Sequence, residues 1–432
     1  MVRVREPENR NPAAANRIVS RVPETSDERA VRRWLIPFGS AIALVVGNGA
    51  ISVFAFGIFI KPLEAQFGWS RAALSGATAL CGLLSAIALP FVGLLIDRVG
   101  VRRPLMVAIG LFAANVAAVG LSDSLFWFQL LIALTGITGA AQGPIGYVRS
   151  ISSYFDRRRG LAIGIAMSGV GLGTALVPVY AQWLIEHFGW RVAYAGLGLA
   201  ILVLAWPMVF AVIREPPNAN RAPALSGGVV TAIPGLSLQE VLALPMFWLL
   251  AGAVLLVSVA VNGSLVHVVP MLADRGWSPG NASSVMVAAG LAGMIGRLVA
   301  GFLIDRIFAP HVAMVFFLLA IGGVYGLSTQ LYVVPGAIGV GLAAGAEVDM
   351  IGFLVSRYFG LKSFGQIYGL LFSIFTIGAG LGPYLVGVTF TAFQSYDKAL
   401  LGLGCLLAAA IACFALIGPY RYKPRQTLKS ET

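Results

Sequence analysis

Twelve apolar stretches dominate this sequence of 432 residues. The hydrocarbon core of a bilayer is about 30 Å thick, and a helix of roughly 20 apolar residues crosses it. Charged residues make up 11% of the chain, against roughly 25% in a soluble domain. The sequence therefore predicts an all-α membrane protein with 12 transmembrane helices, at residues 35–59, 72–96, 104–121, 126–148, 160–184, 192–213, 243–270, 281–304, 311–328, 332–355, 365–390 and 397–418.

The distribution of positive charge predicts the orientation. Residues 1–34 contain eight Arg residues and no apolar run, so they lack the core of a signal peptide and are typical of a disordered tail. With this tail in the cytoplasm, 24 of the 30 Lys and Arg residues are cytoplasmic, five are outside and one lies within a span. The positive-inside rule thus predicts a multi-pass protein with both termini cytoplasmic.

The same asymmetry explains the net charge of +12. Topology and attraction to anionic membrane lipids account for this charge, so the charge does not indicate nucleic-acid binding. Cys81, Cys405 and Cys413 all fall in predicted spans and indicate neither a disulfide nor a metal site. The sequence shows no metal-ligand cluster and no nucleophile with its base, so we expect no enzyme activity, no metal and no cofactor.

An internal repeat predicts the domain organisation. Between Gly68 and Arg98, 12 of 31 positions are identical to those 208 residues later, and SSYF at 152–155 matches SRYF at 356–359. A duplicated unit with an even number of helices gives parallel repeats around a central cavity. We expect six-helix bundles at residues 35–213 and 243–418, a cytoplasmic linker at 214–242 and a cytoplasmic tail at 419–432.

Local signals mark several helix starts. Ser70 and Ser278 each follow Gly-Trp and are placed to cap the helices after them. Ser237 and Glu240 have the spacing of a capping box, which predicts a short surface helix before the seventh span.

Two predicted cytoplasmic loops carry one charged motif, GLLIDRVGVRR from Gly93 and GFLIDR from Gly301. It resembles the G-x-x-x-D-R-x-G signature of the major facilitator superfamily. With the duplication, the resemblance covers nearly the whole chain. It implies a latch that closes the cytoplasmic side of the cavity, with carboxylates near helix N-termini. The residues expected in this cytoplasmic gate are Asp97, Arg98, Arg102, Arg103, Asp305 and Arg306. A charged turn that only fixes topology would not explain why Gly and Asp recur.

Further segments narrow the resemblance. YVRSISSYFDRRRG from Tyr147 and GFLVSRYFGLKSFGQIYG from Gly352, with FGWSRAALSGA and LVHVVPMLADRGWS, look like the monocarboxylate transporter and oxalate/formate antiporter branch in its prokaryotic form. The resemblance implies a carrier of a small organic anion in the inner (plasma) membrane. We expect it to function as a monomer.

Three strongly charged residues fall well inside spans, namely Arg297, Glu347 and Asp349. Each costs roughly 2.5 to 3.5 kcal/mol near a helix centre, so they should face a cavity or one another. The repeat places uncharged residues at the matching positions of the first half. Features shared by both halves serve the scaffold, so we expect the substrate chemistry at these three residues.

Arg297 is a fixed cation whose planar fork suits a carboxylate. The resemblance agrees, because an Arg at this place in the eighth span binds the substrate anion in related carriers. The alternative is that Arg297 only forms a buried pair with an acid of the tenth span, for which the substrate would then compete.

Glu347 and Asp349 are two residues apart, hence about 200° apart around a helix. We expect Asp349 to face the cavity and Arg297, and Glu347 to pack among neighbouring helices, although periodicity alone does not fix the order. With one cation and two acids, one carboxyl should carry a coupling proton. His267 could join the proton path, since its ordinary pKa lies near neutrality, or it could simply be a satisfied residue between helices.

Four polar residues on spans are expected to line the cavity and bind substrate: Asn48, Gln142, Tyr147 and Asn262.

At three places the sequence differs from the residues typical of the carriers that it resembles. Animal monocarboxylate carriers have a Lys where Phe54 aligns and an Asp where Gly293 stands, and the oxalate carrier has a second cation where residues 365–390 have none. A single cavity cation favours a monocarboxylate or another small monoanion over a dicarboxylate.

The sequence thus predicts a secondary active transporter that moves a small organic anion with a proton by alternating access. An exporter of lipophilic or cationic compounds, an anion exchanger without proton coupling, and a membrane sensor remain as alternatives.

Overall fold

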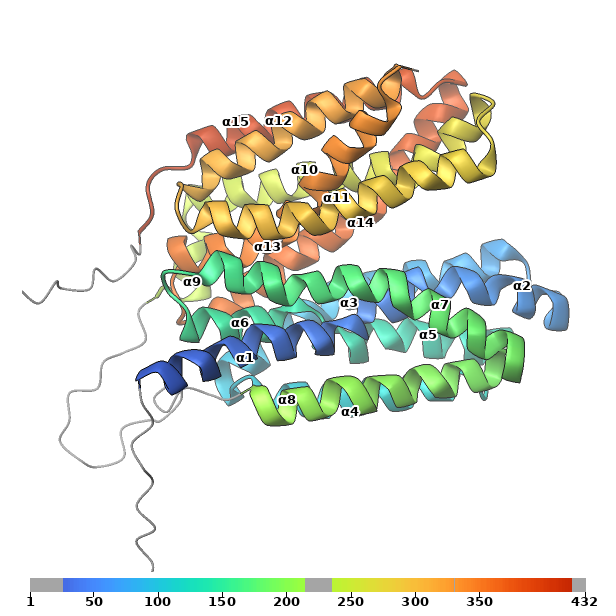
Figure 1. Ribbon diagram of the computed structural model, residues 1–432, viewed down its shortest axis with the longest axis horizontal. Helices are drawn as coiled ribbons and strands as arrows, with labels where there is room; N and C mark the ends of the chain where they lie inside the picture. Colours follow the sequence, from blue (N-terminus) through green and yellow to red (C-terminus); the bar gives the residue numbers. More distant parts are fainter. Residues whose placement is uncertain (1–25, 214–234, 330, 422–432) are drawn as a thin grey trace, which may run out of the picture.

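The computed structural model describes residues 26–213, 235–329 and 331–421. Within them every named element is helical, and two groups of helices lie side by side (Figure 1). The first group comprises α1 (Ser26–Val45), α2 (Phe56–Phe67), α3 (Arg71–Val99), α4 (Arg102–Val119), α5 (Leu125–Ala140), α6 (Pro144–Tyr154), α7 (Arg159–Ala200) and α8 (Trp206–Val212), with the π-helical segments η2 (Gly49–Phe54) and η3 (Ile201–Ala205).

The second group follows the short helix α9 (Leu238–Leu242). It comprises α10 (Pro245–Asp274), α11 (Pro279–Ile304), α12 (Ala309–Ser328), α13 (Val333–Tyr358), α14 (Phe364–Phe393) and α15 (Asp397–Leu416). We call the surface between the two groups the seam. The terminal side is the end at which α1 begins and α15 ends, and the distal side is the opposite end (Figure 1).

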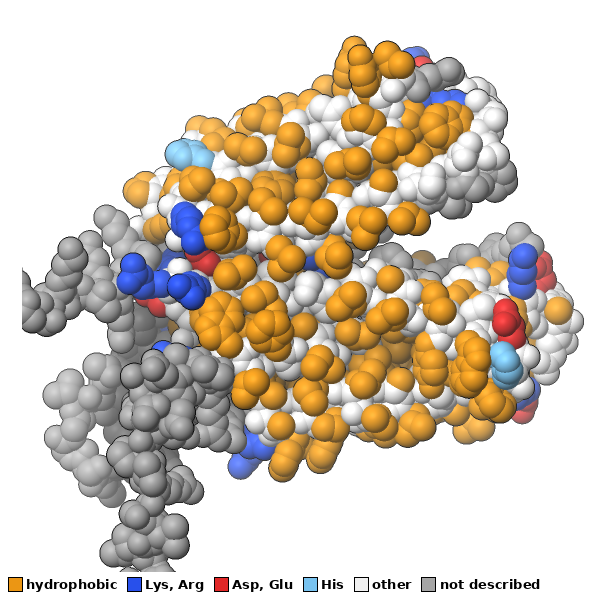
Figure 2. Space-filling model, in the orientation of Figure 1, with side chains coloured by type: hydrophobic (Ala, Val, Ile, Leu, Met, Phe, Trp, Pro, Cys, Tyr) orange, Lys and Arg blue, Asp and Glu red, His pale blue; other side chains and the backbone are white. Residues whose placement is uncertain are grey.

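Eleven helical stretches are long and apolar enough to cross a membrane. The predicted fifth and sixth spans together form one of them, Arg159–Val212, because one helix follows the other directly, with a break only at Gly189, where φ is 82° and ψ is 165°. This conformation is essentially restricted to glycine, and it turns the chain back into the membrane. The fold is therefore the expected multi-pass helical one, with apolar side chains over the spans and charges gathered toward the two ends (Figure 2).

Helix starts follow the local signals. The Ser70 and Ser278 side chains accept hydrogen bonds from the backbone N–H groups of Ala73 and Asn281. Ser237 and Glu240 form the full capping box of α9. These local bonds satisfy backbone donors that the first turn of a helix leaves free.

The structure corrects the predicted tail at one point and leaves part of it untested. Residues 26–34, expected to be disordered, form the first turns of α1, whereas residues 1–25 lie outside the described residues. Of the predicted linker, 214–234 lies outside them and 235–242 contains α9. Of the predicted C-terminal tail, residues 422–432 lie outside them, and the Tyr420 hydroxyl accepts a hydrogen bond from the backbone N–H of Ala309 at 2.6 Å.

Candidate functional site

Two carboxylates cross the seam on the terminal side. Asp97, near the end of α3, accepts hydrogen bonds from the backbone N–H groups of Gly365 and Gln366 in the first turn of α14, both at 2.9 Å. Asp305, just after α11, accepts them from Gly160 and Leu161 in the first turn of α7, at 2.7 and 2.9 Å. Each half thus caps a helix of the other half, and the arrangement has the symmetry of the sequence repeat. We call these two carboxylates the latch.

The latch carboxylates are partly shielded from water. Burial raises the pKa of Asp305, because desolvating its carboxylate outweighs the two backbone donors and the nearby Arg357 and Arg159. The two backbone donors and the nearby arginines act in the opposite direction, because they favour the charged carboxylate.

A second group of bonds across the seam was missed from the sequence. Arg357 at the end of α13 bonds to the Asp156 carboxylate at 2.7 Å and to its carbonyl oxygen at 2.6 Å. Arg159 at the start of α7 donates to the Ser356 hydroxyl at 2.6 Å. Within the first half, Nε of Arg149 lies 3.9 Å from the latch carboxylate of Asp97 and supports it. The signal was present, because these residues lie in or beside the repeated SSYF and SRYF segments.

The arginines predicted for the cytoplasmic gate lie elsewhere. Arg102 donates to the carbonyl oxygen of Phe210 within the first half, at 2.8 Å. Arg306 bonds to Phe302 of its own helix and lies over its ring. Arg98 and Arg103 are exposed. Of the six predicted gate residues, Asp97 and Asp305 therefore carry the described bonds across the seam.

The seam is closed on the terminal side and open on the distal side. On the terminal side the backbones of Gly93 and Gly365, and of Gly160 and Gly301, are so close that a side chain on any of them would overlap the partner helix. Toward the distal side the two halves part, as the notch at the right of Figure 2 shows. This is the geometry of a carrier with one side latched.

Arg297 lies on the seam, two turns of α11 before the latch. Its Nη1 donates to the carbonyl oxygen of Met167 on α7, in the other half, at 2.5 Å. Gly164 of α7 packs against the backbone of Arg297, which holds the two helices together at this level. Glu347 and Asp349 both interact electrostatically with Arg297. Among the described residues, however, no carboxylate forms a salt bridge with it within 4.0 Å.

The two acids of α13 face in different directions. Gly345, one turn before Asp349, packs on the α11 backbone at Gly293, and Gly352, just after it, packs on Val148 of the other half. Asp349 therefore points toward the seam, where it is 1% exposed. Neither of its carboxylate oxygens has a hydrogen-bond partner among the described residues.

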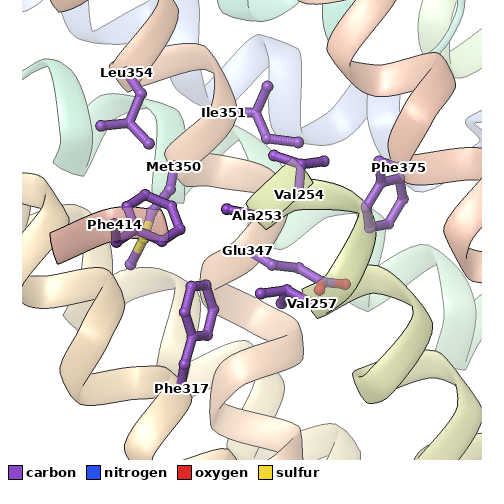
Figure 3. A pocket seen from close by; sticks show the side chains of 10 residues that line it. All are labelled: Ala253, Val254, Val257, Phe317, Glu347, Met350, Ile351, Leu354, Phe375 and Phe414. Atoms are coloured by element: carbon purple, nitrogen blue, oxygen red, sulfur yellow. The ribbon is translucent and has the colours of Figure 1, made fainter. Parts of the chain in front are cut away.

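Glu347 instead faces the interior of the second half. Figure 3 shows Glu347 at an apolar cavity that is also lined from four other helices by Val257, Phe317, Phe375 and Phe414, and its carboxyl points toward Val257 and Phe375. The cavity is about the size needed for one water molecule. Oε2 of Glu347 has no hydrogen-bond partner in the described part of the chain.

Two polar residues of α10, Asn262 and His267, lie in the second half together with Glu347. Asn262 interacts with the Glu347 carboxyl, and its amide also donates to the Ser258 carbonyl oxygen at 3.0 Å. His267 lies nearer the distal side, with Nε2 3.0 Å from the carbonyl oxygen of Pro383 on α14. A carbonyl only accepts, so Nε2 carries the proton, and Nδ1 is buried without a partner among the described residues. The structure thus places His267 between α10 and α14.

Three residues predicted to line the cavity pack inside the first half. Gln142 and Tyr147 are both 0% exposed, so in this conformation protein encloses their side chains, and their contact with a substrate stays a prediction. Gln142 donates to the Ala43 carbonyl oxygen and accepts from the Tyr147 hydroxyl, each at 3.1 Å. Ala43 lies in the last turn of α1, so the Gln142 side chain satisfies a carbonyl oxygen that this helix end leaves free. Asn48, partly buried between α1 and η2, packs against Gly139 of α5.

Sequence comparison agrees with this architecture. The family model of the Major Facilitator Superfamily matches residues 42–383. Monocarboxylate transporter 13 of Bos taurus is 27% identical over 389 residues, which is 87% of this chain and 87% of that protein. Monocarboxylate transporter 12-B of Danio rerio is 25% identical over 434 residues, covering 92% and 89%. Monocarboxylate transporter 11 of Homo sapiens is 27% identical over 391 residues, covering 86% and 79%.

Solved structures share the fold. FucP, a transporter in the outward conformation, superposes with a TM-score of 0.70 at 13% identity, over 89% of this chain and 99% of FucP. The proton:xylose symporter XylE superposes with a TM-score of 0.71 at 13% identity, over 91% and 98%. All these similar proteins are transporters rather than enzymes. Together with the two latched halves, the match over most of the chain shows that this protein belongs to the Major Facilitator Superfamily and is a membrane transporter.

Proposed function

We propose that the chain carries a small organic monoanion, of the monocarboxylate class, together with a proton by alternating access. The terminal side then faces the cytoplasm of the cell that holds the carrier in its inner (plasma) membrane, as the positive-inside distribution favours. The names of the relatives support the substrate class.

The position of Arg297 carries this proposal. A guanidinium inside a membrane protein is costly unless an anion compensates it. In the described chain the hydrogen bond of Arg297 goes to a neutral carbonyl oxygen, that of Met167, and no carboxylate reaches it within 4.0 Å. The planar fork of an Arg matches a carboxylate in two parallel bonds. A substrate carboxylate that enters from the open distal side supplies the missing anion.

Asp349 provides a site for the proton. An ionised carboxyl with neither water nor a donor costs several kcal/mol, and Asp349 is buried with both oxygens unpartnered among the described residues. The carboxyl is therefore best accommodated in its protonated form in this state. A substrate anion on Arg297 cancels the positive charge that otherwise favours an ionised Asp349. Anion binding thus promotes proton binding, which is the linkage that a symporter needs.

The test uses purified protein in liposomes that contain a trapped pH dye. A panel of small monocarboxylates is added to wild type, Arg297→Gln and Arg306→Gln, and protein-free liposomes correct for diffusion of the neutral acids. We expect saturable acidification with wild type and with Arg306→Gln, because the described hydrogen bond of the Arg306 side chain goes to Phe302 in the same half and not across the seam. Arg297→Gln should reduce the rate at least tenfold, because it removes a charge-assisted bond worth about 1.5 to 3 kcal/mol.

The other outcomes separate the alternatives. Acidification that Arg297→Gln leaves intact would contradict the role of Arg297. If wild-type liposomes acidify no faster than protein-free liposomes with any acid, the proposal of proton symport is wrong. Counterflow of labelled anions would then identify an anion exchanger. Counterflow of cationic compounds without counterflow of anions would identify an exporter.

A further inference from the structure

Two buried polar groups lie together where α13 meets α14. Tyr368, one turn into α14, is 0% exposed. Its hydroxyl, like both oxygens of Asp349, has no hydrogen-bond partner within the described residues. The two side chains interact electrostatically. A phenol can donate a hydrogen bond that a carboxylate can accept, so each group supplies what the other lacks.

The packing holds the Tyr368 ring in place. The ring lies between Phe364 and Phe372, with ring centroids 5.8 and 5.7 Å away and planes 11° apart in both pairs. Gly352, three residues after Asp349, leaves room for the ring, because a Cβ there would lie 3.3 Å from its Cε2. The aromatic stack therefore holds the ring beside α13, the helix that carries Asp349.

The same stack reaches the latch. Phe364 is the first residue of α14, and the next two residues donate their N–H groups to Asp97 of the other half. Arg149, which pairs with Asp97, lies over the Phe364 ring at 5.6 Å. The aromatic stack thus connects Tyr368 with the helix end that the latch holds, and this contact fixes the position of the ring.

We propose that Tyr368 is the hydrogen-bond donor that stabilises Asp349 when this carboxyl has released its proton. The inference rests on the proton coupling proposed above. Asp349 gives its proton to water after the terminal side opens, and the carboxylate left behind accepts a hydrogen bond from the Tyr368 hydroxyl, which keeps its own proton. Tyr368 thus acts on proton release and not on anion binding.

The charged and titratable groups around Asp349 are few among the described residues. α11 contributes Arg297 and α14 contributes Tyr368. On its own helix Glu347 faces the cavity of the second half, and α6 contributes the apolar Val148. Arg159 of α7 bonds to Ser356, about two turns closer to the terminal side. Once an anion occupies Arg297, Tyr368 is the donor that remains near the carboxyl within the described part of the chain.

The test compares Tyr368→Phe with Tyr194→Phe. The Tyr194 hydroxyl of the first half is also buried without a partner among the described residues, so removing it is a matched change of packing and polarity. Proton-linked net efflux of a monocarboxylate is measured between pH 5 and 9, and exchange is measured with saturating anion on both sides. During exchange the carrier moves back with anion and proton bound, so Asp349 keeps its proton. Net efflux requires Asp349 to release its proton.

We expect Tyr368→Phe to lower net efflux about tenfold at neutral pH and to move its half-maximal pH upward by about one unit, which is the effect of losing one hydrogen bond to a charged group. Exchange should stay within twofold of wild type, and Tyr194→Phe should match wild type in both assays. Net efflux by Tyr368→Phe equal to wild type would overturn the inference, and so would equal losses in efflux and exchange. If wild type itself moves no protons, the proposed symport fails instead.

Discussion

Replacing Gly93 with alanine should prevent the terminal side from closing. The glycine lies on α3 directly against the backbone of α14, where an added Cβ would overlap the carbonyl oxygen of Gly365 and lie 2.8 Å from the nitrogen of Gln366. Non-bonded heavy atoms rest about 3.5 to 4.0 Å apart. The neighbouring atoms are backbone and cannot rotate away, so the two helices have to move apart by roughly 1 Å.

That displacement breaks one half of the latch. Both bonds from α14 to Asp97 are 2.9 Å long, and an increase of roughly 1 Å takes them beyond hydrogen-bond range. A bond to a charged group contributes about 1.5 to 3 kcal/mol. Losing two therefore destabilises the closed terminal side by about 3 kcal/mol or more, which is at least a 100-fold change in the ratio of closed to open protein at about 1.4 kcal/mol per tenfold.

Thiol labelling from the terminal side measures this ratio. Ser152→Cys, in a protein whose Cys81, Cys405 and Cys413 have been replaced, puts a reporter at a position that is 1% exposed. It lies four residues after Val148, which packs across the seam, so both are on one helix face. Opening exposes it to a membrane-impermeant reagent.

We expect Gly93→Ala to raise the labelling rate about 100-fold and to abolish net transport. Gly82→Ala is the control on the same helix, because no atom lies within 4 Å of the added Cβ and alanine favours a helix over glycine. If the labelling rate of Gly93→Ala is as low as that of Gly82→Ala, the close approach of α3 and α14 does not keep the terminal side closed. Thermal unfolding of both variants checks that they fold.

Two further results are expected. Since burial raises the pKa of Asp305, the closed state binds a proton more tightly than the open one. The added stability of closure is then complete below the ordinary Asp pKa of about 3.9 and is lost as pH rises through the raised pKa. Acidifying the terminal side should accordingly slow labelling at Ser152→Cys by more than the loss of reactive thiolate alone, and Asp305→Asn should reduce this excess. Glu347→Gln should keep transport and raise Tm by about 2 °C, because a neutral amide fits the apolar cavity better than a carboxyl. A lower Tm with lost transport would indicate that Glu347 is needed in its charged form.

Features that depend on neighbouring residues could be predicted from the sequence. The spans follow from apolar length, and the caps at Ser70, Ser237 and Ser278 follow from bonds within three residues. The duplication predicted that Asp97 and Asp305 are equivalent, and the structure places both at helix N-termini. These signals need no knowledge of how the halves meet.

Partners far apart in the sequence could not be predicted in the same way. The bond between Arg357 and Asp156 joins residues 201 positions apart, and it depends on how two bundles are placed against each other. Gln142 and Tyr147 appeared polar enough for a cavity, but Gln142 donates to a backbone carbonyl oxygen of its own half and Tyr147 donates to the Gln142 side chain. Burial of a polar side chain is decided by which backbone groups lie unsatisfied nearby.

The sequence alone determined a duplicated twelve-span chain with one Arg and two acids inside the membrane of its second half. Only the tertiary structure decided that Asp349 faces the seam and Glu347 the cavity of the second half. The physical reason is that periodicity fixes the angle between two residues of a helix but not the direction of either. That direction is set by packing, here by Gly345 and Gly352, which bring α13 against its neighbours.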